Sequence, residues 1–174
     1  MRKDDAVSID HSSSVLNPEY EPEGEAYWMV RQVGLDIKTN GERLKPHEVR
    51  FAERMIGLGQ VIEWISRGEP DASGALMPSN DFIWISHGFA VCELKSTTLR
   101  YKTIKERLRD AVAKAEVKGF VKDRFVIDLG VRQLPDSLKR ALEKFNLRTE
   151  GSRIKQLWVM SRDGGRLEEI HLRA

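Results

Sequence analysis

The sequence contains a single cysteine, Cys92, among its 174 residues. One cysteine cannot form an intramolecular disulfide, and it excludes zinc sites built from paired C-x-x-C motifs. We therefore expect either a reducing compartment or a fold that is stable without a covalent cross-link. Cys92 lies within an apolar run, where it is predicted to be a small buried side chain.

Long hydrophobic runs are also lacking. No apolar run approaches the roughly 18 residues that a membrane span requires, and the N-terminal residues MRKDDAVSIDHSSS contain no apolar signal-peptide core. With 40% hydrophobic and 32% charged residues, the composition is typical of a soluble globular protein. We predict a flexible acidic lead-in over residues 1–25 and one domain over residues 26–174, with its core at 45–130. We expect a cytoplasmic site of action and no membrane partner.

The net charge of +2 conceals an uneven distribution along the chain. Residues 1–25 hold seven acids against two bases, whereas residues 95–124 hold ten bases against four acids. A local surplus of six positive charges suggests a polyanionic substrate or partner. The alternative interpretation is an ordinary solvated helix face.

The segment Asp81–Lys95 reads DFIWISHGFAVCELK and combines apolar runs with three charged residues. Two short apolar runs rich in aromatic and β-branched residues flank a Gly-containing turn, a pattern that predicts a β-hairpin. Asp81 begins this hairpin, and Glu93 and Lys95 lie near its end. Because side chains alternate along a strand, Glu93 and Lys95 share one face. Charges are rare in buried strands unless they are paired or bind a metal, so a functional site is predicted here.

The remaining helices and strands are predicted from the spacing of apolar residues and from the positions of Gly and Pro. Helices are predicted from Pro46 to about Leu58, over 102–117 and over 135–145. Further strands are predicted over 60–65, 124–130, 154–160 and 166–172, and residues 26–33 are predicted to be an apolar patch packed on the domain. The fold class is therefore α/β, a mixed sheet flanked by helices, with a parallel crossover from the Glu93 strand through helix 102–117 to the strand at 124. Asp128 is interpreted as a strand-end cap, with a supporting role at the site as the alternative.

The helix that begins at Pro46 contributes a further carboxylate. Helical spacing places Glu48 on the apolar face with Ala52 and Met55, while Glu53 is expected to face water. A carboxylate on the inward face requires a partner. Two interpretations remain open for Glu48: it pairs with a base, or it points into the active site.

Asp81 and Glu93 suggest metal chemistry. Two neighbouring carboxylates repel unless a cation or a proton intervenes, and Mg²⁺ commonly takes one or two carboxylates together with water and phosphate oxygens. We therefore expect Asp81 and Glu93 to bind Mg²⁺ (or another divalent cation such as Mn²⁺ or Zn²⁺), with Glu48 as an outer ligand or water anchor. Lys95 would orient or deprotonate the attacking water, or neutralise phosphate charge. Four bases on the following helix are predicted to hold a nucleic-acid backbone: Lys105, Arg107, Arg109 and Lys114.

Taken together, these residues resemble a known superfamily. Asp81-x11-Glu93-x-Lys95, after a helix with Glu48, resembles the PD-(D/E)XK (restriction-endonuclease-like) nucleases and their αβββαβ core. The run ELKSTTLRYKTIKERLRDAVAKAEVKGFVKDRFVIDLG also resembles the C-terminal toxin domains of contact-dependent growth inhibition (CdiA-type) proteins, and HEVRFAERMIGLGQVIEWI is similar to their first helix and strand. Asn80 departs from the proline of the motif.

The resemblance implies a metal-dependent endonuclease, in this subfamily mostly a toxin that cleaves tRNA inside a target cell and is neutralised by a cognate immunity protein. By the same resemblance, the catalytic set is Glu48, Asp81, Glu93 and Lys95. The alternatives are a DNA endonuclease of phage or mobile-element origin with the same fold, and a non-catalytic nucleic-acid-binding module.

Overall fold

A computed structural model describes residues 24–68, 70, 72–77 and 79–174. The predicted lead-in therefore lies almost entirely outside the described residues. Within them, the chain forms four α-helices and six strands in this order: α2 (Glu25–Val33), α3 (Pro46–Gly57), β1 (Ile62–Trp64), β2 (Phe82–Trp84), β3 (Ala90–Ser96), α4 (Tyr101–Val117), β4 (Arg124–Asp128), α5 (Asp136–Glu143), β5 (Gln156–Ser161) and β6 (Arg166–Glu169).

The six strands form one mixed sheet in the order β1-β2-β3-β4-β5-β6. The first three are antiparallel neighbours, β3, β4 and β5 are parallel to one another, and β6 returns antiparallel to β5. Helix α4 connects β3 to the parallel strand β4, as the predicted crossover required. The expectation of an α/β fold with a mixed sheet is therefore confirmed.

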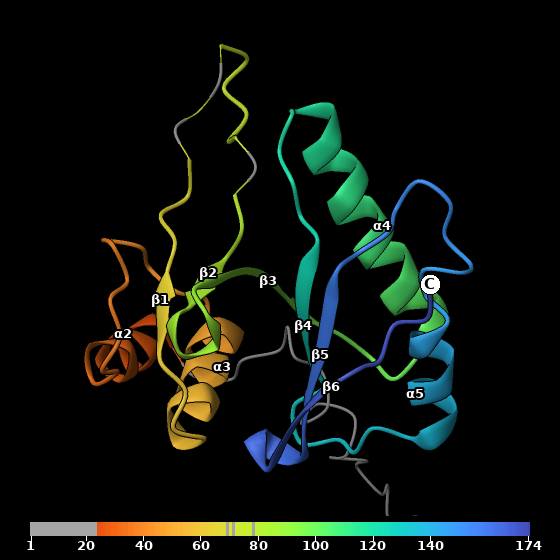
Figure 1. Ribbon diagram of the computed structural model, residues 1–174. Coiled ribbons are helices and arrows are strands. Elements are labelled where there is room, and N and C mark those ends of the chain that lie inside the picture. Colours follow the sequence, from red (N-terminus) through yellow and green to blue (C-terminus); the bar gives the residue numbers. More distant parts are fainter. Residues whose placement is uncertain (1–23, 69, 71, 78) are drawn as a thin grey trace, which may run out of the picture.

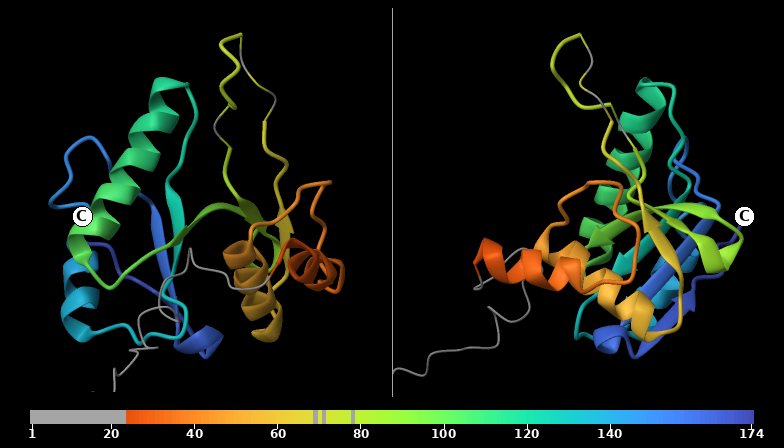
Figure 2. Two further views of the ribbon diagram at one scale, coloured as in Figure 1. Left: turned by 180° about the vertical axis from the view of Figure 1, so that it is seen from behind. Right: turned by 90° about the vertical axis from the view of Figure 1, so that its left-hand side faces the viewer.

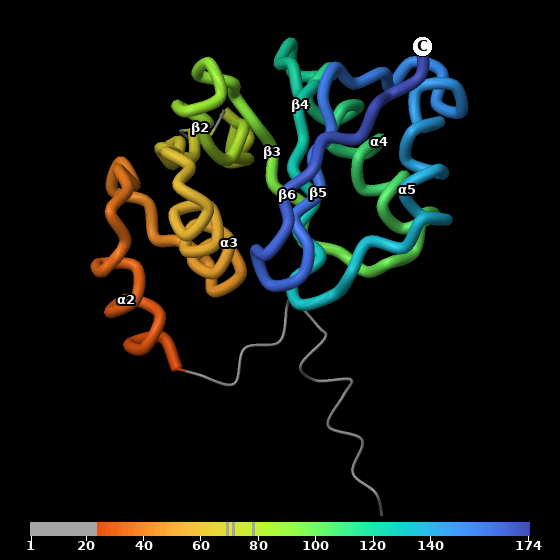
Figure 3. The backbone as a smooth tube through the Cα atoms, turned by 60° about the horizontal axis from the view of Figure 1, so that its bottom comes forward, coloured from red at the N-terminus to blue at the C-terminus, as the bar shows by residue number. Residues whose placement is uncertain are grey.

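Helices cover both faces of the sheet (Figure 3): α2 and α3 lie on one side, and α4 and α5 on the other. Side-chain alternation produces two cores. Leu94 of β3 and Val126 of β4 belong to the core beneath α3, whereas Phe125 and Ile127 of β4 pack with Leu108 of α4. Neighbouring residues of β4 thus point into different cores, and the buried apolar residues of β3, Cys92 and Leu94, belong to the core beneath α3.

Several elements differ from the prediction in extent. Residues 26–33, expected as an apolar patch, form helix α2. The strand expected over 60–65 is reduced to Ile62–Trp64, because Gln60 N–H still bonds to the Met55 carbonyl of α3. The hairpin turn contains a short 3₁₀ helix that ends at Gly88, which adopts a φ of 66°. In the part of the chain that is described, no helix is long and apolar enough to cross a membrane.

Helix α2 is attached to α3 through a charged and aromatic contact. Trp28 is its buried residue, and the guanidinium groups of Arg31 and Arg50 lie 4.7 and 5.1 Å from the Trp28 ring centre. Arg31 also forms an ion pair with Glu53 of α3. The expectation that Glu53 faces water alone is therefore corrected, since its carboxylate is half-buried against Arg31.

Arg54 links α3 to the end of β4 and to the β5–β6 turn, and we call its contacts with Asp128 and Asp163 the Arg54 clamp. This side chain donates at 2.7 Å to the buried Asp128 at the end of β4. It also contacts Asp163, in the short turn between β5 and β6, at 2.8 Å. The turn approaches α3 so closely that a Cβ on Gly164 would lie 2.8 Å from the Arg54 Cβ and Cγ atoms. Gly164 also has a φ of 81°, which favours glycine.

This close approach generates a stability prediction. Gly164→Ala should lower the free energy of unfolding by about 2–4 kcal/mol, because a left-handed residue gains a Cβ and the Arg54 clamp must shift. Gly119→Ala is the matched control. Its φ is also positive, but nothing lies within 4 Å of the added Cβ, so only the backbone cost of about 1–2 kcal/mol applies. Urea unfolding followed by circular dichroism measures both, and equal losses would contradict the packing argument.

Candidate active site

Asp81 lies at the entrance of β2 and is bonded to the backbone of β3. Its N–H donates to the Cys92 carbonyl at 3.0 Å, and its carboxylate Oδ2 accepts the Leu94 N–H at 2.7 Å. Phe82, the next residue, points into the core beneath α3. Alternation therefore directs Asp81 toward the opposite face, the one that α4 covers.

Glu93 and Lys95 project from β3 toward the same helix. Leu94 between them points into the core beneath α3, as the predicted alternation requires. Glu93 is only 4% exposed, yet both of its carboxylate oxygens have cationic partners. Lys95 Nζ lies 2.7 Å from Oε1, and Lys122 Nζ lies 2.7 Å from Oε2. The buried charge is thus compensated by two ammonium groups.

The electrostatics of Asp81 show that these side chains form one cluster. Burial and, after it, the negative charge of Glu93 raise the pKa of Asp81 to about 7, while the Leu94 N–H and the ammonium groups of Lys95 and Lys122 oppose the shift. The two carboxylates are therefore close enough to repel each other, as the sequence analysis expected. We refer below to Asp81, Glu93, Lys95 and Lys122 as the acid–lysine cluster.

A cavity of about 420 Å³ lies over this cluster, between β3 and α4. The sheet side contributes Glu93, Lys95 and Lys122, and α4 contributes Arg107, Asp110, Ala111, Lys114 and Ala115. At the same end of the molecule, the C-terminal end of α4 and the loop between β1 and β2 project side by side (Figures 1 and 2). The cluster therefore borders an open cavity, and the opposite side of this cavity carries the bases Arg107 and Lys114 of α4.

The four bases predicted to hold nucleic acid separate into two groups. Arg107 and Lys114, seven positions apart on one flank of α4, line the cavity. Arg107 also donates to the Ser96 carbonyl at 2.6 Å, which holds it against the end of β3. Lys105 and Arg109 lie on the other flank and are not among the lining residues of this cavity. A role for those two in binding stays a prediction without support from the cavity.

Glu48 is buried, as its position on the helix predicted, but its partners lie outside the acid–lysine cluster. The carboxylate accepts the Lys45 N–H at the start of α3 at 2.6 Å, and both of its oxygens lie 3.3 Å from Arg67 Nη2. Burial raises the pKa of Glu48, against these two stabilising contacts. The interactions are those of a helix cap and an ion pair, so they favour the pairing interpretation over direct metal contact.

Asp128 serves as the strand-end cap that was predicted. One carboxylate oxygen accepts the Gly130 N–H at 2.8 Å, and the other binds Arg54. Burial raises the pKa of Asp128, and Arg54 opposes the shift. Because its side chain faces α3, Asp128 belongs to the Arg54 clamp and not to the cavity under α4.

Lys122 is the residue that the sequence analysis missed. It lies in the connection between α4 and β4 and was counted only within the local basic surplus. The predicted parallel crossover could have identified it, because a parallel β4 must begin at the same edge of the sheet as β3. Residues just before β4 must then lie beside Glu93 and its neighbours on β3.

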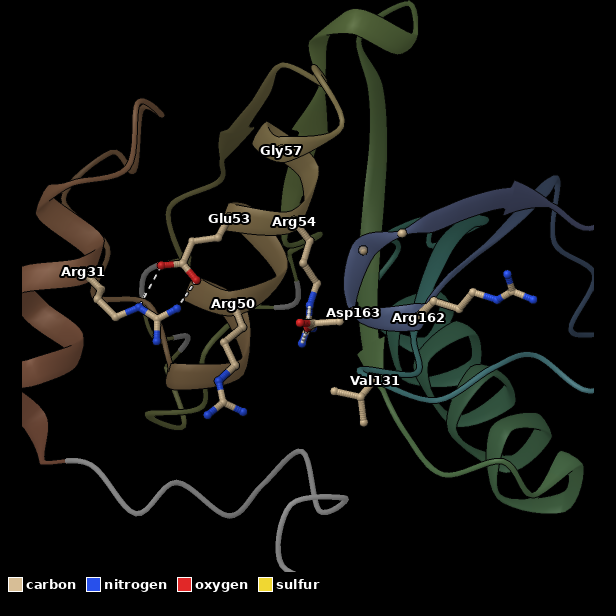
Figure 4. Close-up of a pocket in the computed structure, with 10 residues that line it drawn as sticks. Arg31, Arg50, Glu53, Arg54, Gly57, Val131, Arg162 and Asp163 are labelled. Carbon is tan, nitrogen blue, oxygen red and sulfur yellow. Dashed lines mark hydrogen bonds and ion pairs between the residues drawn. The ribbon is translucent and has the colours of Figure 1, made fainter. Parts of the chain in front are cut away.

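A second and larger cavity, of about 760 Å³, lies between α3 and the β5–β6 turn (Figure 4). Its charges are largely paired with one another, since Arg31 binds Glu53 and Arg54 binds Asp163. The Arg162 side chain points away from Arg54 in Figure 4. The smaller cavity is lined by Glu93, which together with the neighbouring Asp81 forms the buried carboxylate pair that could hold a metal ion, and we therefore place the candidate site there.

The donor set suits a cation that keeps several non-protein ligands. Among the described residues, no group of three or more His, Cys, Asp or Glu side chains is positioned to hold a metal ion. Asp81 and Glu93 alone offer two carboxylates, the number with which Mg²⁺ is commonly bound when water and phosphate oxygens supply the rest. The same residues suit a zinc site less well, because structural and catalytic zinc ions usually take three or four protein ligands.

Comparison with known proteins adds no further constraint. The chain matches no protein-family model, no curated protein and no solved structure.

The shifted pKa of Asp81 predicts how stability depends on pH. In the folded protein the pKa of the Asp81 carboxyl is about 7, whereas its ordinary pKa is 3.8. The folded state thus holds more protons over this interval, and in EDTA its stability should fall as pH rises from about 4 to about 7. Asp81→Asn removes this cost while retaining an acceptor for the Leu94 N–H. Its gain over the wild type should be near zero at pH 4 and exceed about 1 kcal/mol at pH 8.

Thermal unfolding across this pH range provides the measurement. Glu116→Gln, on the exposed surface of α4, is the control and should show the same pH profile as the wild type. A constant difference between Asp81→Asn and wild type from pH 4 to 8 would show that Asp81 titrates normally.

Proposed function

We propose that this protein is a metal-dependent endonuclease and that it acts as a ribonuclease toxin that cleaves tRNA. The observation that carries the proposal is the buried pair of Asp81 and Glu93, whose Glu93 lines a cavity together with Lys95, Arg107 and Lys114. Two buried acids that repel each other form a site for a divalent cation, and the bases suit a polyanion.

The order of elements supports assignment to the PD-(D/E)XK core. Helix α3, strands β1, β2 and β3, helix α4 and strand β4 follow one another as α-β-β-β-α-β. An acid opens the second strand, and Glu-x-Lys lies on the third. These are the positions that the sequence resemblance implied for Asp81, Glu93 and Lys95.

Each residue has a distinct role in the proposed reaction. Asp81 and Glu93 hold the cation, which would be Mg²⁺ or another divalent ion such as Mn²⁺ or Zn²⁺. When bound, such an ion lowers the pKa of a coordinated water and stabilises charge on phosphate oxygens. Lys95 orients the attacking water or neutralises the phosphodiester, and Arg107 and Lys114 position the nucleic-acid backbone. Glu48 acts through the start of α3, where it fixes the helix end and Arg67.

The choice of tRNA, a cytoplasmic site of action and a cognate immunity protein rests on the resemblance of about residues 45–130 to growth-inhibition toxins. A DNA endonuclease of the same fold is the alternative substrate class. One observation favours a non-catalytic nucleic-acid-binding module instead: Glu93 is fully ion-paired by two lysines. Such pairing is also what a purely structural network would show.

The first functional prediction concerns cleavage. Purified protein should cleave total tRNA in Mg²⁺ or Mn²⁺ and lose activity in EDTA, with plasmid DNA as the second substrate. Asp81→Asn, Glu93→Gln and Lys95→Met should each lower kcat by about 100-fold or more, because each removes a group that acts on the transition state. Glu116→Gln serves as the matched control and should retain wild-type activity.

Three outcomes would separate the candidates. Cleavage of plasmid but not of tRNA would favour the DNA endonuclease. Binding of either polymer without cleavage in any metal would favour the non-catalytic module. Full activity in EDTA, or in both acid variants, would refute the metal mechanism.

The second functional prediction distinguishes the two flanks of α4. Lys114→Ala should raise KM for tRNA by about fivefold to tenfold, because it removes a phosphate contact at the cavity and leaves the acid–lysine cluster in place. Lys105→Ala removes the same charge from the other flank and should raise KM by a smaller factor. Steady-state kinetics at two salt concentrations provide the measurement. A larger effect of Lys105→Ala would place the substrate on the opposite flank.

A further inference from the structure

Glu93 is fully occupied by ammonium groups. Its Oε1 and Oε2 atoms each lie 2.7 Å from a lysine nitrogen, of Lys95 and Lys122 respectively. With Asp81 ionised, the cluster carries two negative and two positive formal charges and is neutral. A divalent cation that takes an oxygen of Glu93 competes with the ammonium group already on that oxygen, and repulsion between the two cations favours departure of the ammonium group.

The two lysines differ in how they reach Glu93. Lys95 lies two residues further along β3 on the same face, so the strand itself keeps the two side chains adjacent. Lys122 extends into the cluster from the connection between α4 and β4, and its side chain is 11% exposed. Rotation of the Lys122 side chain removes its ammonium group from Glu93 without any change in the strand.

The backbone around Lys122 is fixed on both sides. The buried Asn80, next to Asp81, donates from Nδ2 to the Val121 carbonyl at 3.4 Å. The Asp123 carbonyl accepts the N–H of Lys155 at 2.6 Å. Lys122 therefore remains at the rim of the cavity whichever way its side chain turns. That rim also carries Lys114 of α4.

We propose that Lys122 is an intramolecular substitute for the metal ion: its ammonium group holds Glu93 Oε2 in the metal-free protein, is displaced when a divalent cation binds, and then contacts the substrate phosphate. This inference rests on the proposed metal site and adds a positioning residue that couples metal binding to substrate binding. In the metal-free protein, Lys122 neutralises the carboxylate. In the metal-bound protein, the ammonium group of Lys122 contacts a phosphate of the nucleic acid.

The test is calorimetric titration of the full chain with Mn²⁺ alone. Lys122→Met retains the length of the side chain but cannot compete for Glu93, so it should bind Mn²⁺ about tenfold more tightly than the wild type. Lys122→Arg retains the charge and should remain closer to the wild type than Lys122→Met does. Lys102→Met, an exposed lysine at the opposite end of α4, removes the same net charge and should change the affinity by less than twofold.

The second readout is kinetic. With Mn²⁺ saturating, Lys122→Met should lower kcat/KM for tRNA by about tenfold, because the displaced ammonium group is no longer available to the phosphate. Tighter Mn²⁺ binding with unchanged kcat/KM would overturn the transfer to phosphate.

A folded Lys122→Met protein, verified by circular dichroism, that binds Mn²⁺ no more tightly than the wild type would overturn the displacement. In that case wild-type binding and cleavage would leave the nuclease proposal intact. If the wild type neither binds Mn²⁺ nor cleaves, the proposed function fails and this inference fails with it.

Discussion

Two negative charges buried beside each other are the constraint on which the site depends. Asp81 enters from β2 and Glu93 from β3, and the charge of Glu93 contributes to raising the pKa of Asp81 to about 7. A protein that only needed a stable core would gain by replacing such a pair with apolar residues. The positive groups around the pair are therefore best understood as the means by which the fold tolerates it.

The buried carboxylate that stabilises the fold and the one at the candidate site lie on opposite faces of the sheet. The face beneath α3 carries Asp128, which caps the end of β4 and binds Arg54. The face beneath α4 carries Glu93, and there a cavity remains open over the carboxylate. Both faces of the sheet thus attach helices, and the face beneath α4 also carries a buried carboxylate at an open cavity.

Elements with strong local signals could be predicted from the sequence. The apolar stripe with Ile104 and Leu108 defined α4, and alternation along β3 placed Glu93 and Lys95 on one face. The predicted hairpin was also found, as the antiparallel strands β2 and β3. These features depend on neighbouring residues, so periodicity is sufficient to identify them.

Contacts between distant segments could not be predicted in the same way. The partner of Glu48 is Arg67, which lies beyond β1, and the second cation at Glu93 is Lys122, which follows the whole of α4. Helix α2 was missed because a single buried tryptophan, in contact with two arginines, replaces the usual apolar stripe. In each case the deciding interaction is tertiary, and local pattern contains little information about it.

The central claim, that Asp81 and Glu93 bind one divalent cation on the α4 side of the sheet, is tested most directly by crystals soaked in Mn²⁺. The account predicts one anomalous difference peak within about 2.5 Å of carboxylate oxygens from both residues. An anomalous peak at another site, or none in crystals of a protein that cleaves nucleic acid in Mn²⁺, would contradict it.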